Sequence, residues 1–97
     1  MDNILTIAKF AKKLGVPKEY IDSKSRENRH KIPRQLYWLY LRKRGLDKRM
    51  IARIFDLSHS TISSGIKTIS NLIETKDPIL SQYKDFIYSF LNLPHSN

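Results

Sequence analysis

The chain has 97 residues with a net charge of +9, 40% hydrophobic residues and no cysteine. One domain spanning residues 1–97 is expected, with enough apolar residues to fold without cross-links. The missing cysteines exclude disulfides and thiolate zinc sites, and no apolar run approaches the roughly 18 residues of a membrane span or resembles a signal peptide, so a cytoplasmic location is expected.

The positive charge is concentrated in the middle of the chain. Residues 24–53 contain eleven basic side chains and two acidic ones, which accounts for the whole net charge. Concentrated like charge opposes compaction unless a polyanion neutralises it. Nucleic acid is therefore the expected partner, and a basic face kept for solubility is the alternative.

Two helices are predicted before this basic segment. Apolar residues recur at helical spacing over residues 4–14, with Asp2 or Asn3 as the N-cap and Gly15 as the left-handed stop. A short second helix over residues 18–22 should follow.

A third helix is expected from about Pro33 to Arg44, closed by Gly45. Its predicted core residues are Leu36, Leu39 and Tyr40. Tyr37 and Trp38 point elsewhere around the helix, so they should pack on flanking helices or stay exposed.

A fourth, short helix is predicted between the N-cap Asp47 and Phe55, with Ile51, Ile54 and Phe55 facing inward. After a three-residue break, a fifth helix should begin at Ser58 or His59 and extend to about residue 75. Its apolar stripe consists of Ile62, Ile66, Ile69 and Ile73.

Asp77 and Pro78 should open a last helix with a broad apolar face that covers the core. Alternatively, that face could support a homodimer, which would place two DNA readers about 34 Å apart. The residues concerned are Phe86, Ile87, Phe90 and Leu91. No segment alternates apolar and polar residues, so an all-α fold of about six helices is predicted.

The fourth and fifth helices have the lengths and separation of a helix-turn-helix, the second of which enters the major groove of DNA. Short polar side chains at the start of that helix suit close approach to base edges and phosphates. The candidates are Ser58, His59, Ser60, Thr61, Ser63, Ser64 and Lys67. The alternative is that Ser58 only caps the helix and the serines face solvent.

Basic residues outside the fifth helix should contact the phosphate backbone. Lys48, Arg49 and Arg53 belong to the fourth helix, which would cross the sugar-phosphate chain. A second basic element upstream could grip phosphates or place an arginine in the minor groove. It consists of Arg26, Arg29, Lys31 and Arg34.

Three motifs in this order resemble the C-terminal DNA-binding domain of DnaA, the bacterial chromosomal replication initiator. Residues 23–26 (Ser-Lys-Ser-Arg) resemble the family's Ser-Lys-x-Arg element, and residues 33–35 (Pro-Arg-Gln) resemble the opening of its long helix. Residues 59–62 (His-Ser-Thr-Ile) resemble the end of its Arg-Asp-His-(Thr/Ser)-Thr-Val signature. The similarity covers nearly the whole chain and implies the family's Trp-repressor-like helical fold.

The resemblance also implies site roles. Arg34 would match the family's minor-groove arginine. Lys67 would match a basic residue farther along the recognition helix. The residues that would match those meeting bases or phosphates in the major groove are His59, Ser60 and Thr61. Between Phe55 and His59 the chain has three residues, one fewer than the family's Gly-Gly-Arg-Asp. Recognition of the family's nine-base box is therefore not implied.

No Gly-rich phosphate loop ending in Gly-Lys-Ser/Thr is present, so the initiator's ATPase is not expected. A stand-alone domain could regulate transcription, mark a replication origin or compete with a full-length initiator, in association with the nucleoid.

No catalytic site is predicted, because no serine lies in a nucleophile elbow and the three histidines are far apart without carboxylates at ligand spacing. No metal, cofactor or small-molecule substrate is expected. The alternative function uses the same basic face to bind an acidic protein, or to bind RNA with bases stacked on Tyr37, Trp38 and Tyr40.

Overall fold

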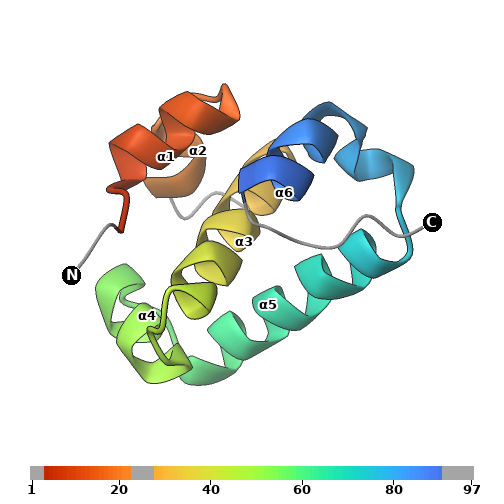
Figure 1. Cartoon of the computed structure of the whole chain (residues 1–97). Helices are drawn as coiled ribbons and strands as arrows, with labels where there is room; N and C mark the ends of the chain where they lie inside the picture. Colours follow the sequence, from red (N-terminus) through yellow and green to blue (C-terminus); the bar gives the residue numbers. More distant parts are fainter. Residues whose placement is uncertain (1–3, 23–27, 91–97) are drawn as a thin grey trace.

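The computed structural model describes residues 4–22 and 28–90, and this part of the chain is all-helical, as predicted (Figure 1). The elements are α1 (Ile7–Leu14), α2 (Glu19–Asp22), α3 (Asn28–Lys43), α4 (Lys48–Phe55), α5 (His59–Glu74), the 3-10 helix η1 (Pro78–Tyr83) and α6 (Lys84–Phe90). Within the described residues, none of these helices has both the length and the apolar character needed to cross a membrane.

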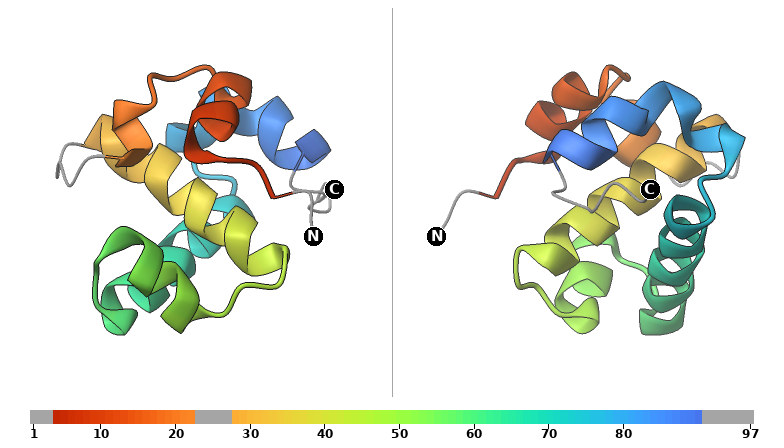
Figure 2. Two further views of the ribbon diagram at one scale, coloured as in Figure 1. Left: turned by 90° about the vertical axis from the view of Figure 1, so that its left-hand side faces the viewer. Right: turned by 45° about the vertical axis from the view of Figure 1, so that its right-hand side comes forward.

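The central element is α3, which contacts α1, α2, α4 and α5. It crosses the molecule with α1, α2 and α6 on one side and α4 and α5 on the other (Figure 2). All six residues from 36 to 41 are buried. A helix buried around its whole circumference has neighbours on every side. Tyr37 and Trp38 therefore belong to the core.

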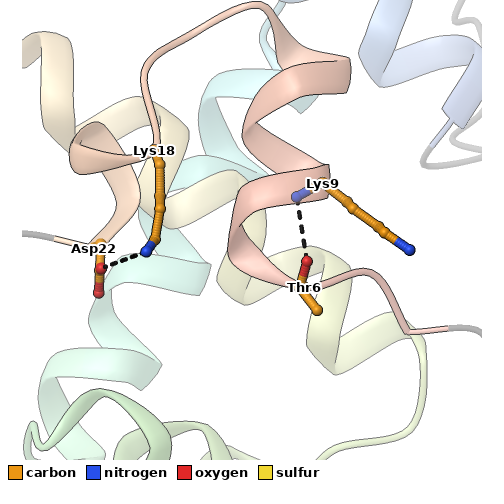
Figure 3. Close-up of polar contacts among 4 residues, drawn as sticks. All are labelled: Thr6, Lys9, Lys18 and Asp22. Carbon is orange, nitrogen blue, oxygen red and sulfur yellow. Dashed lines mark hydrogen bonds and ion pairs between the residues drawn. The ribbon is translucent and has the colours of Figure 1, made fainter.

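The first helix begins later than predicted. Residues 4–6 are not helical, and Thr6 is the N-cap of α1, where its side chain accepts a hydrogen bond from the Lys9 N–H at 3.2 Å (Figure 3). Asp2 or Asn3 as the cap was therefore wrong. The predicted stop is confirmed, because Gly15 has a left-handed φ of 87°.

Two buried tyrosines explain why the segment before α1 stays extended. The Leu5 N–H donates to Oη of Tyr40 at 2.8 Å, and Oη of Tyr37 donates to the Leu5 carbonyl at 2.8 Å. These long-range bonds satisfy both polar groups of the Leu5 peptide, which a helical start could leave without partners. The core of α3 thus fixes where α1 begins.

The third helix begins at Asn28, five residues before the predicted start at Pro33. Proline removes one backbone hydrogen bond from a helix interior, but packing can compensate for that loss. The first turns of α3 pack against α2, and the rings of Tyr20 and His30 lie 4.5 Å apart. Lys18, directly before α2, forms an exposed ion pair of 3.7 Å with Asp22 at the end of that helix (Figure 3).

The C-terminal segment is a 3-10 helix followed by α6, rather than one helix. Its apolar face closes the core, because Leu80, Tyr83 and Ile87 are buried and the Phe86 ring lies 5.2 Å from that of Phe10. The possible homodimer face also includes Leu91 and the side chain of Phe90, which lie outside the described residues.

Candidate nucleic-acid interface

The helix-turn-helix is built by local caps that the sequence predicted. Oδ1 of Asp47 accepts from the Met50 N–H at 2.9 Å and starts α4, and Oγ of Ser58 accepts from the Thr61 N–H at 3.1 Å and starts α5. Asp56 ends α4 with a left-handed φ of 55°, a conformation that aspartate tolerates better than most residues. Three residues therefore suffice to turn the chain between the helices.

The fourth helix packs differently from its prediction at one position. Ile51 and Ala52 are buried and Phe55 is half-buried, whereas Ile54 is 56% exposed. The prediction that Ile54 faces inward was wrong. The helix contacts α3 and α5 on one side only, and its outer side is exposed.

The fifth helix presents a hydroxyl-rich surface at its N-terminal end. Ile62, Ile66 and Ile69 are buried, so the opposite face points outward and exposes Ser60 and Ser64. Oγ of Ser58 lies 2.8 Å from Oγ1 of Thr61 and 3.2 Å from Oγ of Ser60. Helix-terminal amides and hydroxyls together form a favourable environment for anions and base edges.

One side of α5 faces a cationic wall from α3. A groove of about 530 Å³ lies between the two helices, and we call it the α3–α5 groove. Lys31, Arg34 and Gln35 line it from α3, opposite the hydroxyl-bearing residues Thr61, Ser64 and Thr68 of α5. Burial lowers the pKa of the Arg34 guanidinium from its ordinary value, yet arginine starts so high that it stays charged near neutrality.

The other side of α5 faces cations from the end of α3 and the start of α4. A surface hollow of about 330 Å³, the α4 hollow, is lined by Arg42, Asp47, Lys48, Arg49 and His59. Nζ of Lys48 donates to Oγ of Ser63 at 3.2 Å and so ties α4 to α5. The start of α5 is therefore flanked by positive charge on both sides.

Most of the residues predicted for the site lie on this surface. The α3–α5 groove brings together Lys31, Arg34, Thr61 and Ser64, and the α4 hollow brings together Lys48, Arg49 and His59. By helical spacing, Ser60 and Lys67 lie on the exposed face of α5 between them. Arg53 is exposed on α4 but lines neither hollow. Arg26 and the side chain of Arg29 lie outside the described residues.

Several residues that line the two hollows were not predicted for the site, among them Gln35, Arg42 and Thr68. Helical spacing was the available signal for Thr68, which follows Ser64 by four positions. On α3, Gln35 and Arg42 share one face with Lys31, but a helix start placed at Pro33 cut that face in two. Within the described residues, the buried Oε1 of Gln35 has no hydrogen-bond partner.

The aromatic residues considered for base stacking are in the core. Tyr37, Trp38 and Tyr40 are 5%, 4% and 4% exposed. Stacking a base requires an open ring face. The predicted stacking of RNA bases on these rings is therefore wrong. This observation does not test whether the basic face itself binds RNA or an acidic protein.

The chain matches one family model, described as the bacterial dnaA protein helix-turn-helix, over residues 2–69. The match includes α1 to α4 and most of α5, so it covers the interface described above. No curated protein and no solved structure matches the chain. With more than half of its residues matched, the chain belongs to the bacterial DnaA helix-turn-helix family, whose members bind DNA.

Proposed function

We propose that the chain binds duplex DNA in a sequence-dependent manner, with the start of α5 in the major groove. The observation that supports this arrangement best is the placement of cations on both sides of a hydroxyl-rich helix end. A major groove about 12 Å wide is bounded by two phosphate backbones, and an inserted helix needs positive charge toward each. The α3–α5 groove would serve one backbone and the α4 hollow the other.

Within this arrangement, His59, Ser60 and Ser64 read base edges, because they are exposed near the start of α5. Thr61 and Ser63 lie beside the cationic walls and bind phosphate with them. Phosphate contacts also come from the basic residues on the flanking helices, namely Lys31, Arg34, Arg42, Lys48, Arg49 and Arg53. Lys67 lies one turn beyond Ser63 and extends the phosphate contact along α5.

In this proposal the residue that enters the minor groove is Arg26 or Arg29, and not Arg34. Arg34 is half-buried in the wall of the α3–α5 groove, which suits a fixed phosphate contact better than insertion between two backbones. Arg26 or Arg29 would then supply the arginine that a narrow minor groove attracts. Exchange of either for alanine should weaken binding most on sites with an A·T tract.

The biological role we propose is control of replication initiation or of transcription by site occupancy on the nucleoid. Selection of bound sequences from a random duplex library tests the binding proposal directly. Enrichment of a defined motif is the expected result. Equal recovery of all duplexes, or tighter binding to an acidic protein surface than to any duplex, would refute it.

A further inference from the structure

Trp38 lies where the three helices of the interface meet. It belongs to α3, its ring lies 5.9 Å from the Phe55 ring of α4 at 73°, and its six-membered ring faces Gly65 of α5. The side chain is 4% exposed. A rigid aromatic ring held by two neighbouring helices is difficult to displace.

Gly65 is in the middle of α5, where glycine is unfavourable for helix stability. Its backbone has no left-handed conformation that would require glycine. A Cβ atom at this position would lie 2.6 Å from Cε3 of Trp38 and closer still to Cζ3, a separation that real Cβ atoms do not adopt. The glycine therefore permits close approach of the two helices.

This contact also sets the geometry of the α3–α5 groove. Trp38 and Gly65 both line the groove, between the cations Lys31 and Arg34 and the hydroxyl groups of α5. Moving α5 away from Trp38 would separate these walls and shift the base-reading face relative to the α3 cations. The phosphate contacts made by α3 and α4 alone would remain.

We propose that Trp38 is a positioning residue that determines sequence selectivity, by seating Gly65 and thereby fixing the depth and direction of α5 in the groove. This inference rests on the proposed duplex binding. Because packed side chains allow discrete rather than gradual rearrangements, a single added methyl group is expected to displace α5 as a unit.

The test is a double-mutant cycle with Gly65→Ala, Trp38→Phe and the double variant. Each protein is titrated with the duplex enriched by the wild-type protein and with a scrambled duplex of the same composition. The measured quantity is the ratio of the two dissociation constants, at a temperature where circular dichroism shows each protein folded. Ser70→Ala, on α5 outside the α3–α5 groove, is the control for altered helix propensity.

Gly65→Ala should lower the selectivity ratio about tenfold, the size of one lost base contact, while affinity for the scrambled duplex changes little. Phenylalanine lacks the two ring atoms nearest Gly65, so the double variant should recover most of that ratio. Emission from Trp38, the chain's single tryptophan, should change in Gly65→Ala and not in Ser70→Ala.

A folded Gly65→Ala with the wild-type ratio would overturn the inference and leave the proposed function intact. A wild-type protein without any selectivity would overturn both. If Gly65→Ala does not fold, Trp38→Phe tests the inference instead, because this substitution loosens the contact with Gly65 without adding atoms. A clear fall in its ratio supports the positioning role, and an unchanged ratio overturns it.

Discussion

At the scale of single residues, the proposed interface has two classes of side chain, those that we propose read bases and those that we propose bind phosphate. His59 is exposed at the start of α5, whereas Arg34 and Lys48 lie beside it on the flanking helices. A phosphate is the same at every base pair, so only contacts to base edges distinguish sequences. Alanine substitutions in the two classes should therefore affect DNA binding differently.

His59→Ala is expected to relax the sequence preference at one base pair by about 1–3 kcal/mol. Arg34→Ala and Lys48→Ala are expected to weaken binding to all duplexes alike. Fluorescence anisotropy on a set of single-base variants of the enriched duplex measures both effects. Arg44→Ala, which is exposed beyond both hollows, serves as the matched charge control. A uniform loss for His59→Ala across the set would argue against base reading there.

Tyr37 links the core to stability at high pH. Burial, together with the nearby Tyr40, raises the pKa of Tyr37 to about 12 from the ordinary tyrosine value of 10.0. The unfolded chain therefore ionises first as pH rises above about 10, which lowers the free energy of unfolding until the folded state also ionises near 12. The stability that this residue contributes is present below pH 10 and lost above it.

Tyr37→Phe should accordingly flatten the decline in unfolding free energy between pH 10 and about 12, as measured by urea titration at each pH. It should also lower stability at neutral pH by about 1 kcal/mol, because the bond to the Leu5 carbonyl is lost. Part of the decline should remain, since burial also raises the pKa of Tyr83. An unchanged pH dependence would contradict this account of Tyr37.

At the scale of the elements, the caps of the helix-turn-helix stabilise its helices, and one of them also belongs to the proposed DNA-binding surface. Ser58 caps α5 through Oγ and also belongs to the hydroxyl cluster at its N-terminus. A cap removes the cost of an unsatisfied helix amide, and an acidic cap does so equally well. An acidic group at that place would nevertheless repel a phosphate.

Ser58→Ala should therefore cost about 1 kcal/mol of folding free energy, whereas Ser58→Asp should preserve it. Duplex affinity should fall in Ser58→Asp despite its intact fold. Thermal unfolding and duplex titration of the same samples separate the two effects. Duplex affinity of Ser58→Asp at the wild-type level would mean that the start of α5 does not approach DNA.

The ends of α3, α4 and α5 show how far element boundaries could be predicted. Both ends of α4 and the start of α5 follow from Asp47, Asp56 and Ser58, because capping bonds join residues two to four positions apart. The start of α3 could not be predicted in this way. Its first turns are stabilised by packing against α2, which overrides the tendency of Pro33 to begin a helix.

At the scale of the whole molecule, positive charge from α3 and α4 gathers around the start of α5. Five cations line the two hollows, namely Lys31, Arg34, Arg42, Lys48 and Arg49. Each phosphate contact releases condensed counterions from DNA, so affinity depends on salt in proportion to the number of contacts. Five or six contacts predict a log-log slope of about −5.

Titration of the enriched duplex at several salt concentrations measures that slope, and Arg42→Ala should reduce its magnitude by about 1. An acidic protein partner would produce a shallower dependence. A slope near −1 for the wild-type protein would mean that the two hollows do not meet the phosphate backbones.

The monomer should be the binding unit. Ile87 is buried and the Phe86 ring packs on Phe10, so the two residues of the possible dimer face whose side chains the structure describes are used within the chain. Sedimentation of the protein with its enriched duplex should give one chain per site, and the motif should not be palindromic. Two chains bound to a palindromic site, with half-sites about one helical turn apart, would contradict this expectation.

By itself the sequence determined the helical fold class, the caps of the helix-turn-helix and the position of the helix that we propose reads DNA, since these depend on local hydrogen bonds and on apolar spacing along one helix. Only the tertiary structure decided that Tyr37 and Trp38 are buried, and that Arg34 and Lys48 flank α5 from opposite sides. Such features arise where segments distant in the chain pack together, and packing depends on the shapes of all the partners at once.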